Sequence, residues 1–171
     1  QMLGYKSASV GTLGIIGDGI ERYGSLTTPD SITLQQDLAM LAQEKHITHL
    51  AMEASSHGIE QYRLDGVNIG LAAFTNLSRD HLDYHKTMEA YLQAKLRLFT
   101  TLLPAYGTAI VNADMAEFSQ IKHAVKQRMM TYGVNAADLH LEKRSFNAHG
   151  QDLELNVLGK KVSTHINLVG A

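Results

Sequence analysis

Short apolar runs alternate with helical patterns along the first two thirds of the chain. Three runs have the length and composition of buried strands: residues 48–53, 71–75 and 108–112. Apolar residues recur at helical spacing in three further segments: residues 31–45, which Ser31 would cap, a segment capped by Thr87, and residues 116–128. Strands that alternate with helices favour parallel pairing. The pattern therefore predicts an α/β fold, with a mostly parallel sheet flanked by helices.

The last third of the chain has a different pattern. Three short strand-like segments follow one another: residues 139–144, 153–158 and 162–168. Turn residues join them at 147–150 and 158–160, which predicts a small antiparallel β appendage near the C-terminus. We therefore divide the chain into an α/β core, residues 1–136, and the appendage, residues 137–171.

Composition is that of an ordinary globular domain. The chain has 171 residues, of which 44 % are hydrophobic and 19 % charged, and this suits a single domain. Residues 1–4 resemble the tail of a helix and residues 169–171 stop without a cap, so we expect a truncated piece of a longer chain.

Charge and cysteine usage exclude several classes of function. The net charge of −2 gives no basic field for nucleic acid, and no apolar run is long enough to span a membrane. The absence of cysteine excludes disulfides, thiolate metal sites and a cysteine nucleophile. No signal peptide opens the sequence, so we expect a cytoplasmic location. No obligate protein partner is evident from the sequence.

The first segment with candidate chemistry is residues 52–58, Met-Glu-Ala-Ser-Ser-His-Gly. Glu53 follows a predicted strand, and the carboxyl ends of parallel strands are where ligands bind in open sheets. The serines and Gly58 suit phosphate oxygens or the surroundings of a metal ion. The alternative is that Ser55 or Ser56 caps a short helix and that Glu53 is merely exposed.

The second segment is residues 74–85, which is dense in histidine, aspartate and arginine. His81 and His85 are four residues apart, so on a helix they would share a face, as metal-binding pairs do. Asp80 and Asp83 could bind a hard cation or support the imidazoles. The alternative is a solvated loop before the helix at Thr87.

Lys95 lies on an apolar helical stripe whose other members are Met88, Tyr91, Leu92 and Phe99. Periodicity favours a lysine whose stem packs along the stripe while its ammonium reaches water. The alternative is a functional buried amine, because desolvation makes a lysine neutral and able to add carbon dioxide. The resulting carbamate would be an anionic metal ligand.

Two further features are weaker by themselves. Residues 25–30 form a polar loop before a helix, where free amides bind anions, although a plain turn and cap is the better local explanation. Gln61 and Arg63 offer an amide and a guanidinium for a carboxylate or phosphate. The sequence contains neither a G-x-x-x-x-G-K-[ST] loop nor a G-x-G-x-x-G pattern.

Taken together, these motifs resemble the central domain of the Mur ligases, the ATP-dependent amide-forming enzymes of bacterial cell-wall synthesis. The matching segments occur in the family's order: residues 11–14, 27–30, 52–58, 74–85, 94–99 and 111–114. The most specific is residues 76–85, Asn-Leu-Ser-Arg-Asp-His-Leu-Asp-Tyr-His. Residues 27–30, Thr-Thr-Pro-Asp, favour the tripeptide-forming members. These join a third amino acid, usually meso-diaminopimelate or lysine, to UDP-N-acetylmuramoyl-L-alanyl-D-glutamate.

The resemblance implies a role for each candidate residue. Five residues would hold the UDP-muramoyl dipeptide: Thr27, Thr28, Ser55, Gln61 and Arg63. Glu53 would bind one Mg²⁺ ion beside the phosphates of ATP, and Asn76 would lie near the nucleotide. His81 and a carbamylated Lys95 would be the catalytic residues, acting with a second Mg²⁺ ion. We expect Glu53, His81 and Lys95 to meet at one rim of the sheet.

The same resemblance implies an acyl-phosphate mechanism, with meso-diaminopimelate as the expected third amino acid. It places the family's phosphate-binding loop, N-terminal domain and C-terminal domain outside this sequence, so we expect the chain alone to be inactive. The alternatives are another Mur ligase or a folylpolyglutamate synthase relative, or a non-catalytic binding module on the same fold.

Overall fold

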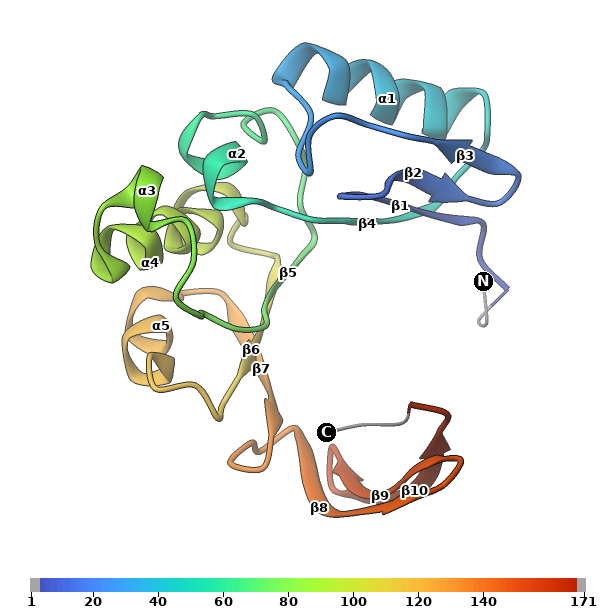
Figure 1. Cartoon of the computed structure of the whole chain (residues 1–171), viewed down its shortest axis with the longest axis vertical. Coiled ribbons are helices and arrows are strands. Elements are labelled where there is room, and N and C mark those ends of the chain that lie inside the picture. The colour runs from blue at the N-terminus through green and yellow to red at the C-terminus, as the bar shows by residue number, and fades with distance from the viewer. Residues whose placement is uncertain (1–3, 169–171) are drawn as a thin grey trace. The chain divides into compact units, whose positions relative to one another are not determined.

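The computed structural model describes residues 4–168 (Figure 1). Its internal contacts divide it into two compact units, and each is described by itself. The first comprises Gln1–Asn68 with His81–Leu102, and the second Ile69–Asp80 with Leu103–Ala171. The expected helix tail falls mostly on residues 1–3, outside the described part, and Gly4 is a bend. The expected uncapped end, residues 169–171, also lies outside it.

A four-stranded sheet of order β3-β2-β1-β4 forms the centre of the first unit. Its strands are β1 (Ser7–Gly11), β2 (Gly14–Gly17), β3 (Ile20–Arg22) and β4 (His49–Met52). β1 pairs with β4 in parallel, whereas β1, β2 and β3 pair as antiparallel hairpins. These hairpins were not predicted from the sequence, because all three strands are short and β1 and β2 contain glycine. β4 was predicted to be buried, but it is an edge strand in which exposed and half-buried residues alternate.

Four helices belong to the same unit: α1 (Ser31–Gln43), α2 (Ser56–Glu60), α3 (Leu82–His85) and α4 (Met88–Arg97). A π-helical segment, η1 (Leu98–Leu102), continues α4. The predicted cap of α1 was wrong by one residue: the Asp30 carboxylate, not Ser31, accepts from the amides of Ile32 and Thr33. The predicted cap of α4 is confirmed, since the Thr87 hydroxyl accepts from the Ala90 amide.

The core of the first unit lies where α1 packs on the sheet. Ala8, Val10 and Ile15 of the sheet form one buried cluster with Leu41 of α1. α4 buries Tyr91, Leu92 and Leu96, and Phe99 of η1 is buried too. Burial of such side chains removes apolar surface from water and fixes the positions of α1 and α4 in this unit.

The second unit contains a six-stranded sheet of order β10-β9-β8-β7-β6-β5. The elements are β5 (Leu71–Phe74), β6 (Thr108–Asn112), α5 (Phe118–Ala124), β7 (Arg128–Gly133), β8 (Leu139–Asn147), β9 (Gly150–Val157) and β10 (Lys160–Ile166). β5 to β8 pair in parallel, and β8 to β10 pair as antiparallel neighbours. The predicted α/β class, parallel strands and antiparallel appendage are confirmed.

One element of the second unit was assigned wrongly from the sequence. The helix predicted over residues 116–128 covers only α5, because Val125 adopts an extended backbone after it. Arg128 instead begins β7, whose six residues include Met129 and Tyr132. β7 pairs with β6 along five positions starting at Arg128, so the last residue of the predicted helix lies in the sheet instead.

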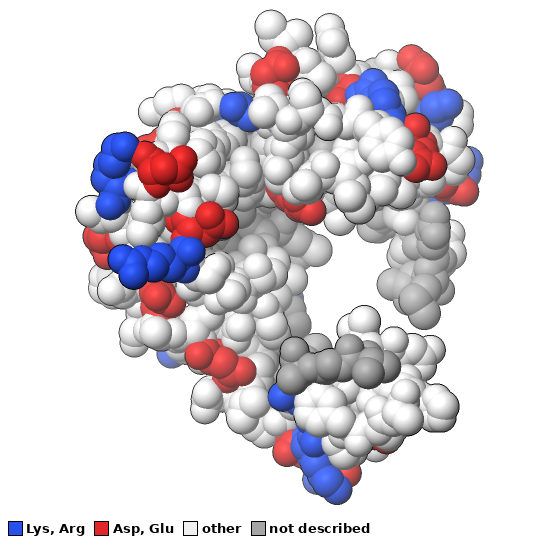
Figure 2. Space-filling model, in the orientation of Figure 1, with Lys and Arg blue, Asp and Glu red and all other residues white. Residues whose placement is uncertain are grey.

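No helix among residues 4–168 is long and apolar enough to cross a membrane. On the face shown in Figure 2, basic and acidic side chains are interspersed, with no broad field of either sign.

Arg97 joins α4 to the segment that follows α2 within the first unit. Its guanidinium donates to both carboxylate oxygens of Asp65, at 2.8 and 2.5 Å, and to the carbonyl of Ile59 at 3.0 Å. The hydrogen bonds from Arg97 hold the pKa of the Asp65 carboxyl below its ordinary value. This forked contact fixes α4, which carries Lys95, against the end of α2.

Replacing Arg97 with lysine is expected to destabilise the protein by about 1–3 kcal/mol, because an ammonium cannot form the fork or reach the Ile59 carbonyl at the same time. Urea unfolding of the variant measures the change. Arg144→Lys, at an exposed position on β8, is the matched control and should unfold like the wild type. Equal stability of Arg97→Lys and the wild type would contradict the clamp.

Candidate functional site

Glu53 directly follows β4, at the strand's carboxyl end. Its amide donates to the Val10 carbonyl at 2.8 Å, which continues the pairing of β4 with β1. Its Oε2 accepts from the amide and the hydroxyl of Thr12, at 3.0 and 2.8 Å. A Cβ on Gly11 would lie 2.5 Å from the Glu53 Cδ, so any larger residue there would displace the Glu53 side chain. The β1–β2 turn thus orients an exposed carboxylate through one of its two oxygens.

The loop before α1 is tied to the same turn and strand. The Thr27 hydroxyl lies 3.1 Å from the Thr12 hydroxyl, which in turn binds Glu53. The Thr28 side chain is completely buried: it donates to the Glu53 carbonyl at 2.8 Å and accepts from the Ser55 amide at 3.0 Å. Both hydrogen bonds of Thr28 therefore hold the segment that carries Glu53 and Ser55.

Ser55 caps α2, as one of the two alternatives for this segment expected. Its hydroxyl accepts from the Gly58 amide at 3.0 Å. A Cβ on Gly58 would lie 2.7 Å from the Thr28 Cβ, so glycine is needed for this close approach. The cap and the exposed Glu53 coexist in one turn, and neither excludes the binding role suggested for this segment.

Arg63 and Gln61 follow α2, and Arg63 binds the same loop. The Arg63 guanidinium donates to the Thr28 carbonyl at 2.7 Å and to the Gln61 Oε1 at 2.5 Å. The Gln61 Nε2 donates to the Tyr84 hydroxyl at 3.3 Å. All five residues predicted to hold the UDP-linked substrate thus belong to one connected set of hydrogen bonds that also contains Glu53.

A cluster of aromatic rings lies beside this set. The His57 ring is 4.1 Å from the Tyr84 ring and 5.1 Å from the His81 ring, measured between centroids. Tyr91 of α4 contacts His81 edge-on at 5.7 Å, and the Lys95 Nζ lies 5.0 Å from the Tyr91 centroid. The contacts in the first unit therefore lead from His57, in the segment after Glu53, to His81 and Lys95.

His81 occupies the residue before α3 with a left-handed backbone, φ 54° and ψ 23°. That conformation is uncommon for residues other than glycine, and such residues cluster at functional sites. Within residues 4–168, no group of three or more His, Asp or Glu side chains is arranged to hold a metal ion. The roles of Glu53, His81 and Lys95 in metal binding therefore stay predictions.

His85 does not pair with His81 as a metal ligand, contrary to the expectation from their spacing. Its ring is buried, with Nε2 2.9 Å from the Ser56 hydroxyl and Nδ1 3.3 Å from the Glu60 carboxylate. Both ring nitrogens are used to hold α3 against α2. α3 is only four residues long, and His81 precedes it rather than lying on its face.

Burial lowers the pKa of His85 below its ordinary value. Glu60 opposes this effect, and His57, His81 and Lys95 add to it. Because the folded-state pKa is below the unfolded one, the unfolded chain binds more protons, and stability is lost as the pH falls through about 6.5.

We expect the free energy of unfolding to fall between pH 7.5 and about 5.5 in the wild type and to fall less steeply in His85→Gln. Urea unfolding at each pH measures the slope, and His123→Gln on α5 is the control, with the wild-type slope. A slope in His85→Gln as steep as that of the wild type would exclude His85 as its source.

Lys95 lies on the predicted stripe of α4. Tyr91, Leu92 and Phe99 are buried, and Lys95 is half-buried among them. The stripe is confirmed, and the ammonium lies over the Tyr91 ring rather than fully in water. This position suits either a packed stem or a functional amine.

Asn76 belongs to the second unit, in the segment after β5. The carbonyl of its neighbour Thr75 accepts from the Asn112 Nδ2 at 3.1 Å and from the Tyr132 hydroxyl at 3.3 Å. These two side chains come from the ends of β6 and β7, so three parallel strands end around the Asn76 segment. Ligands bind at such ends in open sheets.

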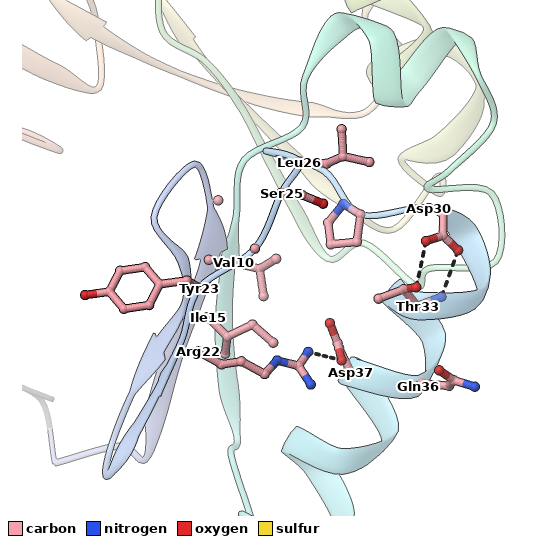
Figure 3. A pocket seen from close by; sticks show the side chains of 14 residues that line it. Val10, Ile15, Arg22, Tyr23, Ser25, Leu26, Asp30, Thr33, Gln36 and Asp37 are labelled. Atoms are coloured by element: carbon pink, nitrogen blue, oxygen red, sulfur yellow. Dashed lines mark hydrogen bonds and ion pairs between the residues drawn. The ribbon is translucent and has the colours of Figure 1, made fainter.

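A cavity of about 350 Å³ lies between the β2–β3 hairpin and α1 (Figure 3). Apolar walls come from Val10, Ile15 and Leu26, and the Arg22 and Asp37 side chains point toward one another and form an ion pair at its edge. The cavity adjoins the loop that carries Thr27 and Thr28, but neither threonine lines it.

Sequence reasoning missed three residues that connect the site. Thr12 orients Glu53, and the rings of His57 and Tyr84 join the substrate residues to His81. Each lies inside a segment that the sequence analysis singled out, so the segments were informative. The contacts themselves join residues up to 41 positions apart and have no signature in spacing.

Comparison with known proteins gives consistent matches over the whole chain. The family model described as "Mur ligase middle domain" matches residues 1–171. The UDP-N-acetylmuramoyl-L-alanyl-D-glutamate–2,6-diaminopimelate ligase of Bradyrhizobium diazoefficiens is 44 % identical over 177 residues, covering 99 % of this chain and 36 % of the relative. The chain thus spans about a third of the length of the curated relatives it matches.

Solved structures agree on the fold. A structure of a UDP-N-acetylmuramoyl-L-alanyl-D-glutamate–2,6-diaminopimelate ligase matches with a TM-score of 0.81 and 32 % identity, covering 99 % of this chain and 35 % of that one. The apo form of L. casei FPGS matches with a TM-score of 0.62 and 10 % identity, covering 92 % and 45 %, which shows a shared fold alone. The chain belongs to the Mur ligase middle domain family.

Proposed function

We propose that this chain is the catalytic middle domain of an ATP-dependent ligase that adds meso-diaminopimelate to UDP-N-acetylmuramoyl-L-alanyl-D-glutamate. The observation that carries the proposal is the connected set of hydrogen bonds around Glu53, which contains all five predicted substrate residues. The name and 44 % identity of the Bradyrhizobium relative support the choice of substrate and of amino acid.

The UDP-linked substrate would bind along the loop before α1 and the segment after α2. Arg63 would bind one of its anionic groups, because a guanidinium matches carboxylate and phosphate oxygens in a fork. Thr27, Ser55 and Gln61 would supply neutral hydrogen bonds around it. Thr28 would support the binding site from the interior, because its buried hydroxyl holds the backbone at Glu53 and Ser55.

Glu53 would hold Mg²⁺ beside the phosphates of ATP. Its Oε2 is fixed by the two hydrogen bonds from Thr12, which keep the carboxylate oriented. Mg²⁺ usually takes one or two carboxylates from a protein and its other ligands from phosphates and water, so a single oriented carboxylate suits it. Asn76 would contact the nucleotide from its own unit. A magnesium ion bound by Glu53 would offset charge on the transferring phosphoryl group.

His81 would hold a second Mg²⁺ ion together with Lys95 in carbamylated form. The donor set fits: His81 supplies an imidazole and Lys95, after modification, a carboxylate-like anion, and the unmodified side chains of both contact the Tyr91 ring. An unmodified ammonium would instead repel a divalent cation.

The proposed reaction has two stages. ATP phosphorylates the D-glutamyl carboxylate, and the amine of the incoming amino acid then attacks the acyl phosphate and displaces phosphate. The chain's own residues would position the carboxylate for attack. Positioning, together with electrostatic stabilisation, supplies most of the catalysis in phosphoryl transfer. A cytoplasmic location follows from this proposal, because UDP-linked precursors and ATP are made there.

The test uses the full-length protein that contains this chain, with ATP, MgCl₂ and UDP-N-acetylmuramoyl-L-alanyl-D-glutamate. We expect the UDP-linked tripeptide, ADP and phosphate in equal amounts with meso-diaminopimelate, and far slower product formation with L-lysine. Mass spectrometry of the nucleotide product measures both. The 171-residue chain alone should form no product.

Two results would contradict the proposal. One is product formation only with UDP-N-acetylmuramoyl-L-alanine or with a folate and glutamate. The other is tight substrate binding without any ATP-dependent turnover, which would favour a non-catalytic binding module.

A further inference from the structure

Tyr84 lies at the end of a chain of directed hydrogen bonds. Arg63 donates to the Gln61 Oε1, and the Gln61 Nε2 donates to the Tyr84 hydroxyl at 3.3 Å. A guanidinium has only donors, so it must face the carbonyl oxygen of the Gln61 amide. That contact fixes the amide's orientation and leaves its NH₂ group facing Tyr84. The Tyr84 oxygen is therefore an acceptor in this chain.

An acceptor role leaves the hydroxyl hydrogen of Tyr84 to be donated elsewhere. Among residues 4–168, the Tyr84 hydroxyl makes one hydrogen bond, which it accepts from Gln61. Tyr84 is 39 % exposed. Water can accept that hydrogen in the free protein. A ligand oxygen that displaces the water would receive a hydrogen bond strengthened by the Arg63 charge at the far end of the chain.

The ring of Tyr84 is held independently of its hydroxyl. It packs at 4.1 Å against His57 and at 4.8 Å, edge-on, against the buried His85. These contacts fix the direction in which the phenol points. Ligand binding would therefore cost little further side-chain entropy at Tyr84. Removing the hydroxyl alone should therefore leave the cluster intact.

We propose that the Tyr84 hydroxyl donates a hydrogen bond to an anionic oxygen of the UDP-linked substrate, and so extends the binding site beyond Gln61 and Arg63. The inference rests on the proposed function, since it takes the same substrate. The occupant is the UDP-linked dipeptide rather than ATP, because Tyr84 is joined through Gln61 to Arg63, which donates to the Thr28 carbonyl in the loop before α1.

The test measures binding of UDP-N-acetylmuramoyl-L-alanyl-D-glutamate to the full-length protein by calorimetry, for the wild type and Tyr84→Phe. We expect the dissociation constant to be about tenfold larger in Tyr84→Phe, which is the usual loss of affinity for one hydrogen bond to a charged group. Binding of a non-hydrolysable ATP analogue with MgCl₂ should change less than about twofold. Tyr62→Phe is the matched control, since that exposed ring packs under Arg97 outside this chain of bonds.

A second variant separates direct contact from support of Gln61. In a Gln61→Met background, Tyr84→Phe should still weaken binding, because the substrate bond is made by Tyr84 itself. Loss of the effect in that background, or unchanged binding in Tyr84→Phe, would overturn the proposal. A weakened ATP analogue with unchanged dipeptide binding would overturn it as well. Failure of the wild type to bind the dipeptide at all would instead count against the proposed function.

Discussion

Lys95→Ala in the full-length protein is expected to lower kcat by about 10²–10³-fold, with far smaller changes in substrate binding. The estimate follows from the loss of an anion that stabilises charge in the transition state, where single groups contribute about 10²–10³-fold or more. The structure gives the lysine a half-buried place on α4, over Tyr91 and in the same ring cluster as His81.

Chemical rescue separates a carbamate from a packed lysine stem. A small carboxylate such as formate or acetate, added to Lys95→Ala, should restore part of the turnover, because it can replace the missing anion. Lys122→Ala, at an exposed position on α5, is the control and should keep wild-type kinetics. Wild-type kinetics in Lys95→Ala would reject the carbamate role and leave a lysine whose stem packs along the stripe while its ammonium reaches water.

Arg63→Ala should raise the KM for the UDP-linked dipeptide by about 10- to 100-fold, which is the range for losing hydrogen bonds to a charged group. The KM for ATP should change little, because the partners of Arg63 are Thr28 and Gln61 of the substrate loop and segment. Steady-state kinetics with each substrate varied in turn measure both values.

Arg63 also supports the fold locally, so stability must be measured beside the kinetics. Arg63→Lys keeps the charge but loses the fork, and its KM should lie between those of the wild type and Arg63→Ala. Arg144→Ala, on an exposed strand of the second unit, should match the wild type. Equal effects of Arg63→Ala on both substrates would remove Arg63 from the dipeptide site.

The sequence predicted the elements with strong periodicity and missed those without it. α1 and α4 have clear apolar stripes, and the Thr87 cap is correct. β1 to β3 have only three to five residues each, and β1 and β2 contain glycine, so their signal is weak. The helix over residues 116–128 was predicted too long because Val125 continues the helical spacing of Ile121, whereas the backbone is extended at Val125 and Arg128 begins β7.

The candidate site was predicted as a set of segments but not as a set of contacts. Glu53 follows β4, as expected, and its segment contains the cap at Ser55. The sequence could not show that Thr12 would orient Glu53 or that His57 would lie between Tyr84 and His81. The spacing of His81 and His85 suggested a metal pair, whereas burial and two hydrogen-bonding partners give His85 a structural role.

The alternatives differ in what they ask of the same residues. A binding module on this fold would need the substrate loop but would have no use for a lysine on the α4 stripe. A folylpolyglutamate synthase relative would share the fold, as the 10 % identical structure does, and would not need the Thr27–Thr28 loop for a UDP-linked dipeptide.

The most direct test is the location of Mn²⁺, substituted for Mg²⁺, by anomalous diffraction from crystals of the full-length protein. The crystals would contain a non-hydrolysable ATP analogue and the UDP-linked dipeptide. We predict one ion bound by Glu53 and a second bound by His81 and a carbamylated Lys95. Ions bound elsewhere, with Glu53 still held only by Thr12 and with Lys95 an unmodified ammonium, would contradict the account.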